Sequence, residues 1–301
     1  MAPSLETRRN GLTPAKPPLT RDALLRRNGV VVAGLDQGKP AVVFVNGFGC
    51  EQGMWRSVAP HFAPSRRVVL FDHVGTGRAQ HLGLPTARYG TLQGYADDLL
   101  EVCDAAEVKG SVLVAHSAGA MIAVLAAIRQ PAFFRQLILL SPSPCFLNDG
   151  SYLGGFERED LDALLEAMDV NFRHWAHQMA PLIMGHPERP ELAWELESSL
   201  NRMEPQLARQ FARASFDCDL RDQLALLRTP TAVLRSAEDN LVPDVVGEFM
   251  RETIADCALV ELQATGHCPH LSAADEITRV VRGLLDNGWI ETQPAELSID
   301  L

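Results

Sequence analysis

The residues most able to carry chemistry surround one serine. Ser117 lies in the pentapeptide Ala-His-Ser-Ala-Gly at 115–119, which follows an apolar run at 111–114 and precedes a long apolar segment at 121–128. A strand, a serine at a sharp turn and then a helix form the layout of a nucleophile elbow. Such a turn presents the serine Oγ to a cleft, and the start of the helix behind it stabilises developing negative charge. Ser117 is therefore the predicted nucleophile.

A serine hydroxyl is a weak nucleophile, so it needs a histidine base and an acid that fixes the tautomer of that base. His267 follows an apolar run at 259–260, and Asp239 follows the run at 231–234. Serine, acid and histidine in this order along the chain form one of the established arrangements of the triad. Asp239 is favoured as the acid because of its position after the strand, and the neighbouring Glu238 is the alternative.

Attack on a carbonyl also requires two main-chain N–H donors for the oxyanion. One donor is expected from Ala118, directly after the nucleophile. The other is expected from Phe48, in the loop Asn46-Gly47-Phe48-Gly49 that follows the apolar run at 41–45. Glycine at two positions of this loop permits conformations and close approaches that other residues resist.

The composition excludes several classes of function. The chain has 301 residues, 47% of them hydrophobic, and a formal net charge of −11. This charge argues against nucleic acid and against anionic membranes as partners, because both attract basic surfaces. The six cysteines have no C-x-x-C spacing, which is typical of reduced thiols. No apolar run is long enough to span a membrane or to form a signal sequence, so we expect a cytoplasmic protein.

Short, nearly continuous apolar runs alternate with helical patterns, which predicts a mostly parallel sheet buried on both faces. The class is therefore α/β, with helices on both sides of the sheet. Between 142 and 227 the alternation stops, and helical patterns appear at 160–169, 172–179, 191–200 and 206–214, with prolines such as Pro181 between or beside them. Helices inserted at this point would roof the cleft at the carboxyl ends of the strands. The predicted parts are a flexible arm at 1–25, a core at 26–141 and 228–290, a helical lid at 142–227 and a tail at 291–301.

A metal centre is not expected from these residue spacings. His267-Cys268-Pro269-His270 resembles a ligand cluster, but no second pair has the spacing of a zinc site. We interpret Cys268 and Cys50 as buried thiols that pack like small apolar groups. His116 is interpreted as structural, because neighbouring side chains in an elbow diverge. No cofactor is expected.

Several motifs together resemble the RsbQ-like family of bacterial stress-response hydrolases, whose plant relatives are the strigolactone and karrikin receptors. The similarity runs from about Arg26 to Trp289 and includes the lid. The motifs are Asn46-Gly47-Phe48-Gly49-Cys50-Glu51-Gln52, Phe71-Asp72-His73-Val74-Gly75-Thr76-Gly77, Ser141-Pro142-Ser143-Pro144-Cys145-Phe146-Leu147-Asn148-Asp149, Gly154-Gly155-Phe156-Glu157 and Gly266-His267-Cys268-Pro269-His270.

The resemblance implies an α/β-hydrolase fold with a four-helix lid and a triad of Ser117, Asp239 and His267. It implies cleavage of a small, mostly apolar ester or lactone, coupled to stress signalling through a regulatory phosphatase or a PAS-domain sensor protein. Two alternatives stay open: a ligand sensor with little turnover, and a carbon–carbon bond hydrolase, which uses the same triad. The expected pocket residues are Phe48, Phe146, Phe156, Trp175, Met179 and Leu241.

Overall fold

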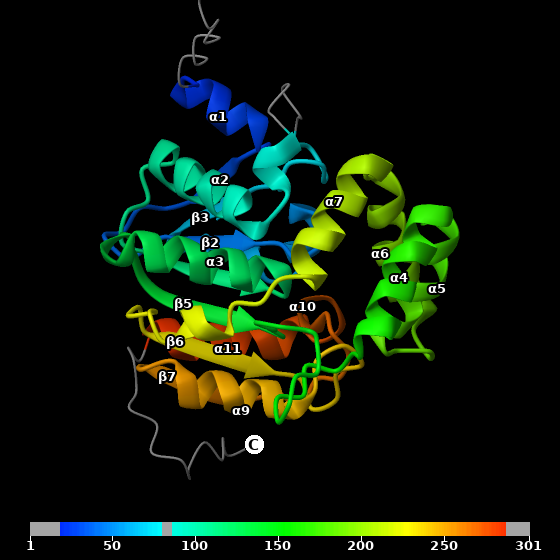
Figure 1. Cartoon of the computed structure of the whole chain (residues 1–301). Helices are drawn as coiled ribbons and strands as arrows, with labels where there is room; N and C mark the ends of the chain where they lie inside the picture. Colours follow the sequence, from blue (N-terminus) through cyan, green and yellow to red (C-terminus); the bar gives the residue numbers. More distant parts are fainter. Residues whose placement is uncertain (1–18, 80–85, 287–301) are drawn as a thin grey trace, which may run out of the picture.

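The structure is organised around a mostly parallel sheet. The computed structural model describes residues 19–79 and 86–286, and these residues form a seven-stranded sheet in the order β1-β3-β2-β4-β5-β6-β7. The edge strand β1 runs antiparallel to β3, and the other neighbours are parallel. This arrangement confirms the predicted fold class. The strands are β1 Val31–Gly34, β2 Val42–Val45, β3 Arg67–Leu70, β4 Ser111–His116, β5 Phe134–Leu140, β6 Thr231–Arg235 and β7 Cys257–Glu261 (Figure 1).

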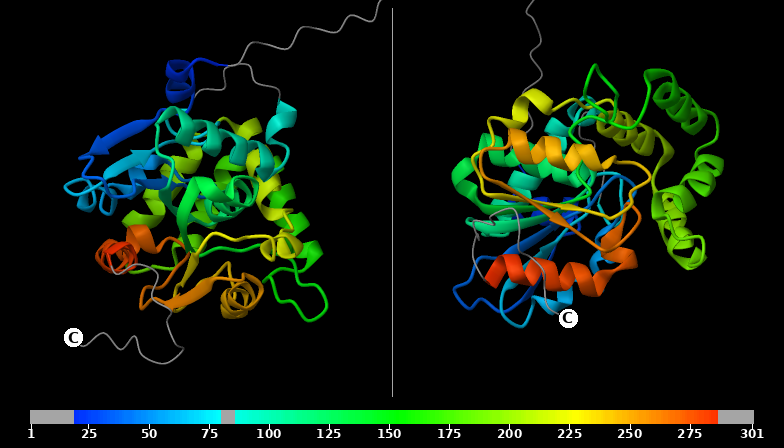
Figure 2. Two further views of the ribbon diagram at one scale, coloured as in Figure 1. Left: turned by 90° about the vertical axis from the view of Figure 1, so that its left-hand side faces the viewer. Right: turned by 90° about the horizontal axis from the view of Figure 1, so that it is seen from below.

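Both faces of the sheet are covered, which explains why its strands lack polar alternation. Successive residues of a strand point to opposite faces, and in β2 the side chains of Val43 and Val45 join one buried cluster while Val42 and Phe44 join another. In the right-hand view of Figure 2, α9 and α11 lie on opposite sides of the sheet. The first face packs against α2 (Leu92–Ala105), α3 (Ala118–Arg129) and α9 (Asp244–Thr253), and the second against η1 (Gln52–Trp55), η2 (Ala59–His61) and α11 (Ala274–Asp286).

Between β5 and β6 the chain leaves the sheet and forms the lid. In Figure 1 the arrowheads of β5 and β6 point toward the lid helices, so the lid stands over the carboxyl ends of the strands. No helix within the described residues has the length and apolar character of a membrane span. The lid helices are α4 Arg158–Val170, α5 Phe172–Met184, α6 Pro190–Arg202 and α7 Pro205–Phe216, and the short α8 Arg221–Leu224 leads back toward β6.

Pro181 lies inside α5 rather than at a break between helices, so the shorter predicted helix is wrong at its end. An interior proline costs about 3 kcal/mol because it removes one N–H and clashes with the preceding turn. The last turns of α5 nevertheless bury Ala180, Ile183 and Met184. This tertiary burial outweighs the local preference, as is common when a helix packs along an amphipathic face.

The N-terminal arm predicted at 1–25 is wrong over its last residues. Helix α1 spans Arg21–Arg27, while residues 1–18 and the predicted tail at 291–301 lie outside the described residues. Arg27 anchors α1, because its guanidinium is buried and forms ion pairs with Asp98 at 3.2 Å and Glu101 at 2.7 Å on α2. Arg88 and the Tyr89 hydroxyl also donate hydrogen bonds to Asp98.

We expect Asp98→Ala to lower the free energy of unfolding by about 3 kcal/mol, because it leaves two guanidinium groups without their buried carboxylate. The matched control is Asp104→Ala on the same helix, where both partners of the ion pair with Lys109 are exposed. The control should change stability by less than about 1 kcal/mol. Urea unfolding followed by circular dichroism measures both variants, and equal losses would contradict a structural role for the buried carboxylate.

Candidate active site

The three predicted triad residues meet at the carboxyl edge of the sheet. Ser117 follows β4, Asp239 follows β6 and His267 follows β7. The Nε2 atom of His267 lies 2.8 Å from Ser117 Oγ, and its Nδ1 atom lies 2.8 Å and 3.1 Å from the two carboxylate oxygens of Asp239. The alternative acid, Glu238, is exposed and accepts a hydrogen bond from Gly266 N–H through its main-chain carbonyl.

The surroundings of Asp239 favour its charged form. Burial alone would raise the pKa of this carboxyl, but the charge of His267, the hydrogen bond from it and the N–H groups of Leu241 and Val242 together lower the pKa. An ionised carboxylate at Nδ1 holds the imidazole in the tautomer whose Nε2 can accept a proton. The pair can therefore support a general base beside Ser117.

Ser117 lies at a strained bend between β4 and α3. Its φ of 52° and ψ of −122° are unusual for a residue with a side chain. The bend brings α3 close to the end of β2, and a Cβ atom at Gly119 would stand 2.3 Å from the Asn46 carbonyl oxygen. The small residues of the pentapeptide thus permit the backbone approach that directs the Ser117 side chain toward His267.

The proposed oxyanion donors flank this bend. Ala118 is the first residue of α3, so its N–H has no acceptor within the helix. Phe48 lies in a turn closed by the hydrogen bond from Cys50 N–H to the Gly47 carbonyl at 3.2 Å, and Gly49 has a φ of 75° there. The positive φ is the conformation that the third position of a type II turn requires.

Buried polar side chains hold this loop in place. The Asn46 amide donates to the Phe71 carbonyl at 2.8 Å, and its oxygen accepts from Trp55 Nε1 at 2.8 Å. Asp72 accepts hydrogen bonds from the main-chain and side-chain nitrogens of Gln52, both at 2.7 Å. The loop is therefore tied to the ends of β2 and β3, as a preformed oxyanion site requires.

The lid contacts the same elements directly. On α6, Ser199 Oγ donates to the Gly49 carbonyl at 2.7 Å, and a Cβ atom at Gly49 would lie 2.4 Å from the Leu200 side chain. On α5, the Ile183 carbonyl accepts from His267 N–H at 3.0 Å. Any movement of α5 or α6 is therefore transmitted to the oxyanion loop or to the histidine.

A narrow pocket lies between the lid and the triad. Phe48, Phe146 and Leu241 line it, as predicted, but the structure places Phe156, Trp175 and Met179 outside the lining. Trp175 packs behind Phe48, with ring centres 6.2 Å apart. Lining residues that the sequence analysis did not assign to the pocket are Ile183, Leu196, Leu200 and Phe216 from the lid, with Cys50, His116 and Cys268 near the triad.

The pocket is small. Its cavity volume is about 30 Å³, which is room for about two water molecules. An ester of ordinary size therefore requires rotation of the apolar lining side chains or displacement of a lid helix. Ser117 and His267 line the pocket together with mostly apolar side chains. No arginine or lysine is among the described residues that line it.

Known proteins share this fold and much of this sequence. The karrikin insensitive 2 receptor CA of Petunia hybrida is 37% identical over 248 residues, which are 82% of this chain and 92% of the receptor. A strigolactone esterase of Arabidopsis thaliana is 37% identical over 249 residues, 82% of this chain and 93% of the esterase. A solved hydrolase from Oleispira antarctica superposes with a TM-score of 0.86 at 35% identity, covering 90% of this chain and 98% of its own.

These relatives confirm the resemblance to the plant receptors that the sequence motifs indicated. The model of the α/β-hydrolase family matches residues 42–280, which include Ser117, Asp239 and His267. With the sheet order, the lid and the shared sequence, the match shows that this chain belongs to the α/β-hydrolase family.

Proposed function

We propose that this protein is a cytoplasmic serine hydrolase that cleaves a small, mostly apolar ester or lactone through an acyl-enzyme. The observation that carries the proposal is the continuous hydrogen-bonded chain from Ser117 Oγ through His267 to Asp239. Relatives named as esterases support the same chemistry.

In the proposed reaction His267 Nε2 takes the Ser117 proton as Oγ attacks the carbonyl carbon. The oxyanion accepts hydrogen bonds from the N–H groups of Phe48 and Ala118, and His267 then gives its proton to the leaving alkoxide. Water, activated by the same imidazole, attacks the acyl-enzyme and releases the acid. In a lactone the leaving oxygen remains joined to the acyl group, so hydrolysis opens the ring and gives one product.

The pocket lining supports an apolar substrate. Phenylalanine, leucine and isoleucine side chains form most of the wall, and burying them against a ligand is favourable at about 25 cal/mol per Å². A carbon–carbon bond hydrolase would need a basic group for a substrate carboxylate. The described lining offers none, so ester or lactone cleavage is the better fit.

Ligand sensing is the second candidate. The small pocket favours it, because a ligand must rotate the lining side chains or displace a lid helix, and the lid contacts both the oxyanion loop and His267. A relative named as a receptor supports the same role. In that role the lid would present an altered surface to a regulatory phosphatase or a PAS-domain sensor protein in stress signalling. Slow single-turnover hydrolysis with tight product retention would favour sensing, and fast multiple turnover would favour metabolism.

We expect Ser117→Ala to lower kcat for a p-nitrophenyl ester by at least about 10⁴-fold, because the attacking oxygen is lost. The matched control is Ser111→Ala, a buried serine at the opposite end of the same strand, which should retain the parent kcat. Steady-state kinetics with both proteins tests the assignment. Parent-level turnover by the Ser117 variant would show that another group attacks the ester.

The rate should fall as the pH is lowered, because protonated His267 cannot accept the serine proton. The surroundings of Asp239 lower the pKa of its carboxyl, so protonation of this group does not explain a fall in rate above about pH 4. A pH profile of kcat/KM measures this effect, and a rate independent of pH down to pH 4 would contradict a histidine base.

Asp239→Asn should reduce the measured kcat by about 10⁴-fold, as in comparable triads.

A further inference from the structure

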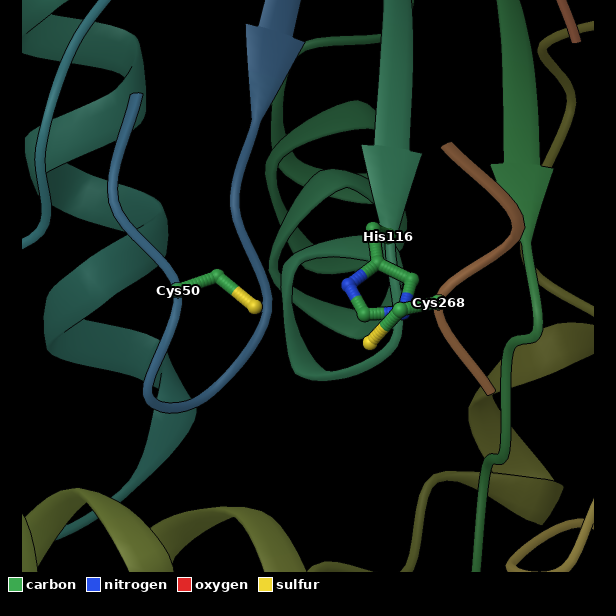
Figure 3. Close-up of side chains that lie close together, drawn as sticks. All are labelled: Cys50, His116 and Cys268. Carbon is green, nitrogen blue, oxygen red and sulfur yellow. The ribbon is translucent and has the colours of Figure 1, made fainter. Parts of the chain in front are cut away.

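Three side chains that the sequence analysis assigned only to packing converge beside the triad. Cys50 comes from the loop after β2, His116 from the end of β4 and Cys268 from the residue after His267. In Figure 3 the Cys50 thiol points toward the His116 imidazole, and the Cys268 side chain overlaps that ring in the view. Their ligand atoms all lie within 4.8 Å of one another, and all three residues are buried and line the pocket.

The hydrogen bonding of the His116 ring leaves one of its nitrogens available to bind a metal ion. Its Nε2 lies 2.8 Å from the His267 carbonyl oxygen, so Nε2 carries the proton and donates it. The lone pair is then on Nδ1, which is buried and makes no hydrogen bond of ordinary geometry within the described chain, although the Cys50 thiol lies close enough to interact with the ring. Metal-binding histidines almost always have this arrangement, with the second ring nitrogen donating to a carbonyl or carboxylate.

Charge and geometry also favour a cation. Two thiolates and a neutral imidazole cancel the charge of a divalent ion, which removes the main cost of burying it. In a tetrahedral zinc site such ligand atoms lie about 3.5–3.8 Å apart, so no pair has to close by more than about 1.3 Å.

We propose that Cys50 Sγ, His116 Nδ1 and Cys268 Sγ form a binding site for a thiolate-preferring divalent ion such as Zn²⁺. Its fourth coordination position faces the pocket, because all three residues line it. Ser117 and His267 line the same pocket, so an ion there lies beside the reacting groups and binds the oxyanion loop through Cys50. An ion in this site therefore inhibits hydrolysis. The inhibition rests on the proposed function, whereas the binding of the ion does not.

Metal binding is tested on the purified protein after treatment with a chelator. The protein is titrated with Co²⁺ and then with Zn²⁺. We expect one Co²⁺ per chain with thiolate-to-metal charge-transfer absorption that Zn²⁺ abolishes. X-ray absorption at the zinc edge of the unmutated protein should show two sulfur neighbours at about 2.3 Å. Absence of the charge-transfer band, or a shell of oxygen and nitrogen alone, would overturn the site without the use of any variant.

Variants then assign the ligands. Cys50→Ser and Cys268→Ser should each weaken Co²⁺ binding by more than about 100-fold, beyond the effect of losing an outer-shell partner. Cys257→Ser removes a partly buried thiol on β7 outside the cluster and should bind Co²⁺ as the parent does. Equal binding by all three variants would overturn the assignment.

Metal binding and esterase activity can be tested independently of each other. Ser117→Ala should bind Co²⁺ like the parent, because Ser117 is not a ligand. Zn²⁺ should inhibit p-nitrophenyl ester hydrolysis by the parent and by Cys257→Ser at the concentrations that fill the site. Binding of Zn²⁺ without inhibition would overturn the inhibitory role of the site. A parent protein without esterase activity would refute the proposed function, and the X-ray absorption and Co²⁺ results would still test whether the metal site exists.

Discussion

The arrangement depends on one strained bend at Ser117. The bend exists because α3 begins immediately after β4 and packs close to the end of β2, where a side chain at Gly119 would collide with the Asn46 carbonyl. The buried sheet and α3 fix both ends of the bend, so its strain is offset by the packing around it. The serine hydroxyl is consequently held at hydrogen-bond distance from His267.

The lid is mechanically linked to this centre. One helix contacts the oxyanion loop through Ser199, and another contacts the His267 main chain through Ile183. Since the pocket is too small for an ester in this conformation, ligand entry and the alignment of the reacting groups are coupled. Such coupling would serve either proposed role, turnover of an ester or sensing of a ligand.

Much of the fold was predictable, because buried strands and amphipathic helices leave strong patterns. The helical pattern at 172–179 begins where α5 begins, whereas β1 was not predicted because an exposed edge strand lacks a buried apolar run. The convergence of Ser117, Asp239 and His267 followed from their positions after strands. The lid residues that line the pocket could not be predicted in this way. Periodicity shows that α5 and α6 have an apolar face, but it does not show that Ile183 reaches the pocket and Trp175 does not. Cys50 and Cys268 are likewise 218 positions apart in sequence, and only the sheet brings them together.

Peptide mass spectrometry of the enzyme quenched in acid during turnover of a p-nitrophenyl ester tests directly whether Ser117 is the nucleophile. We expect the acyl group on the peptide that contains Ser117 and at that residue. An acyl group on Cys50 or another side chain, or turnover with no covalent intermediate under conditions that trap one in a known serine esterase, would contradict it.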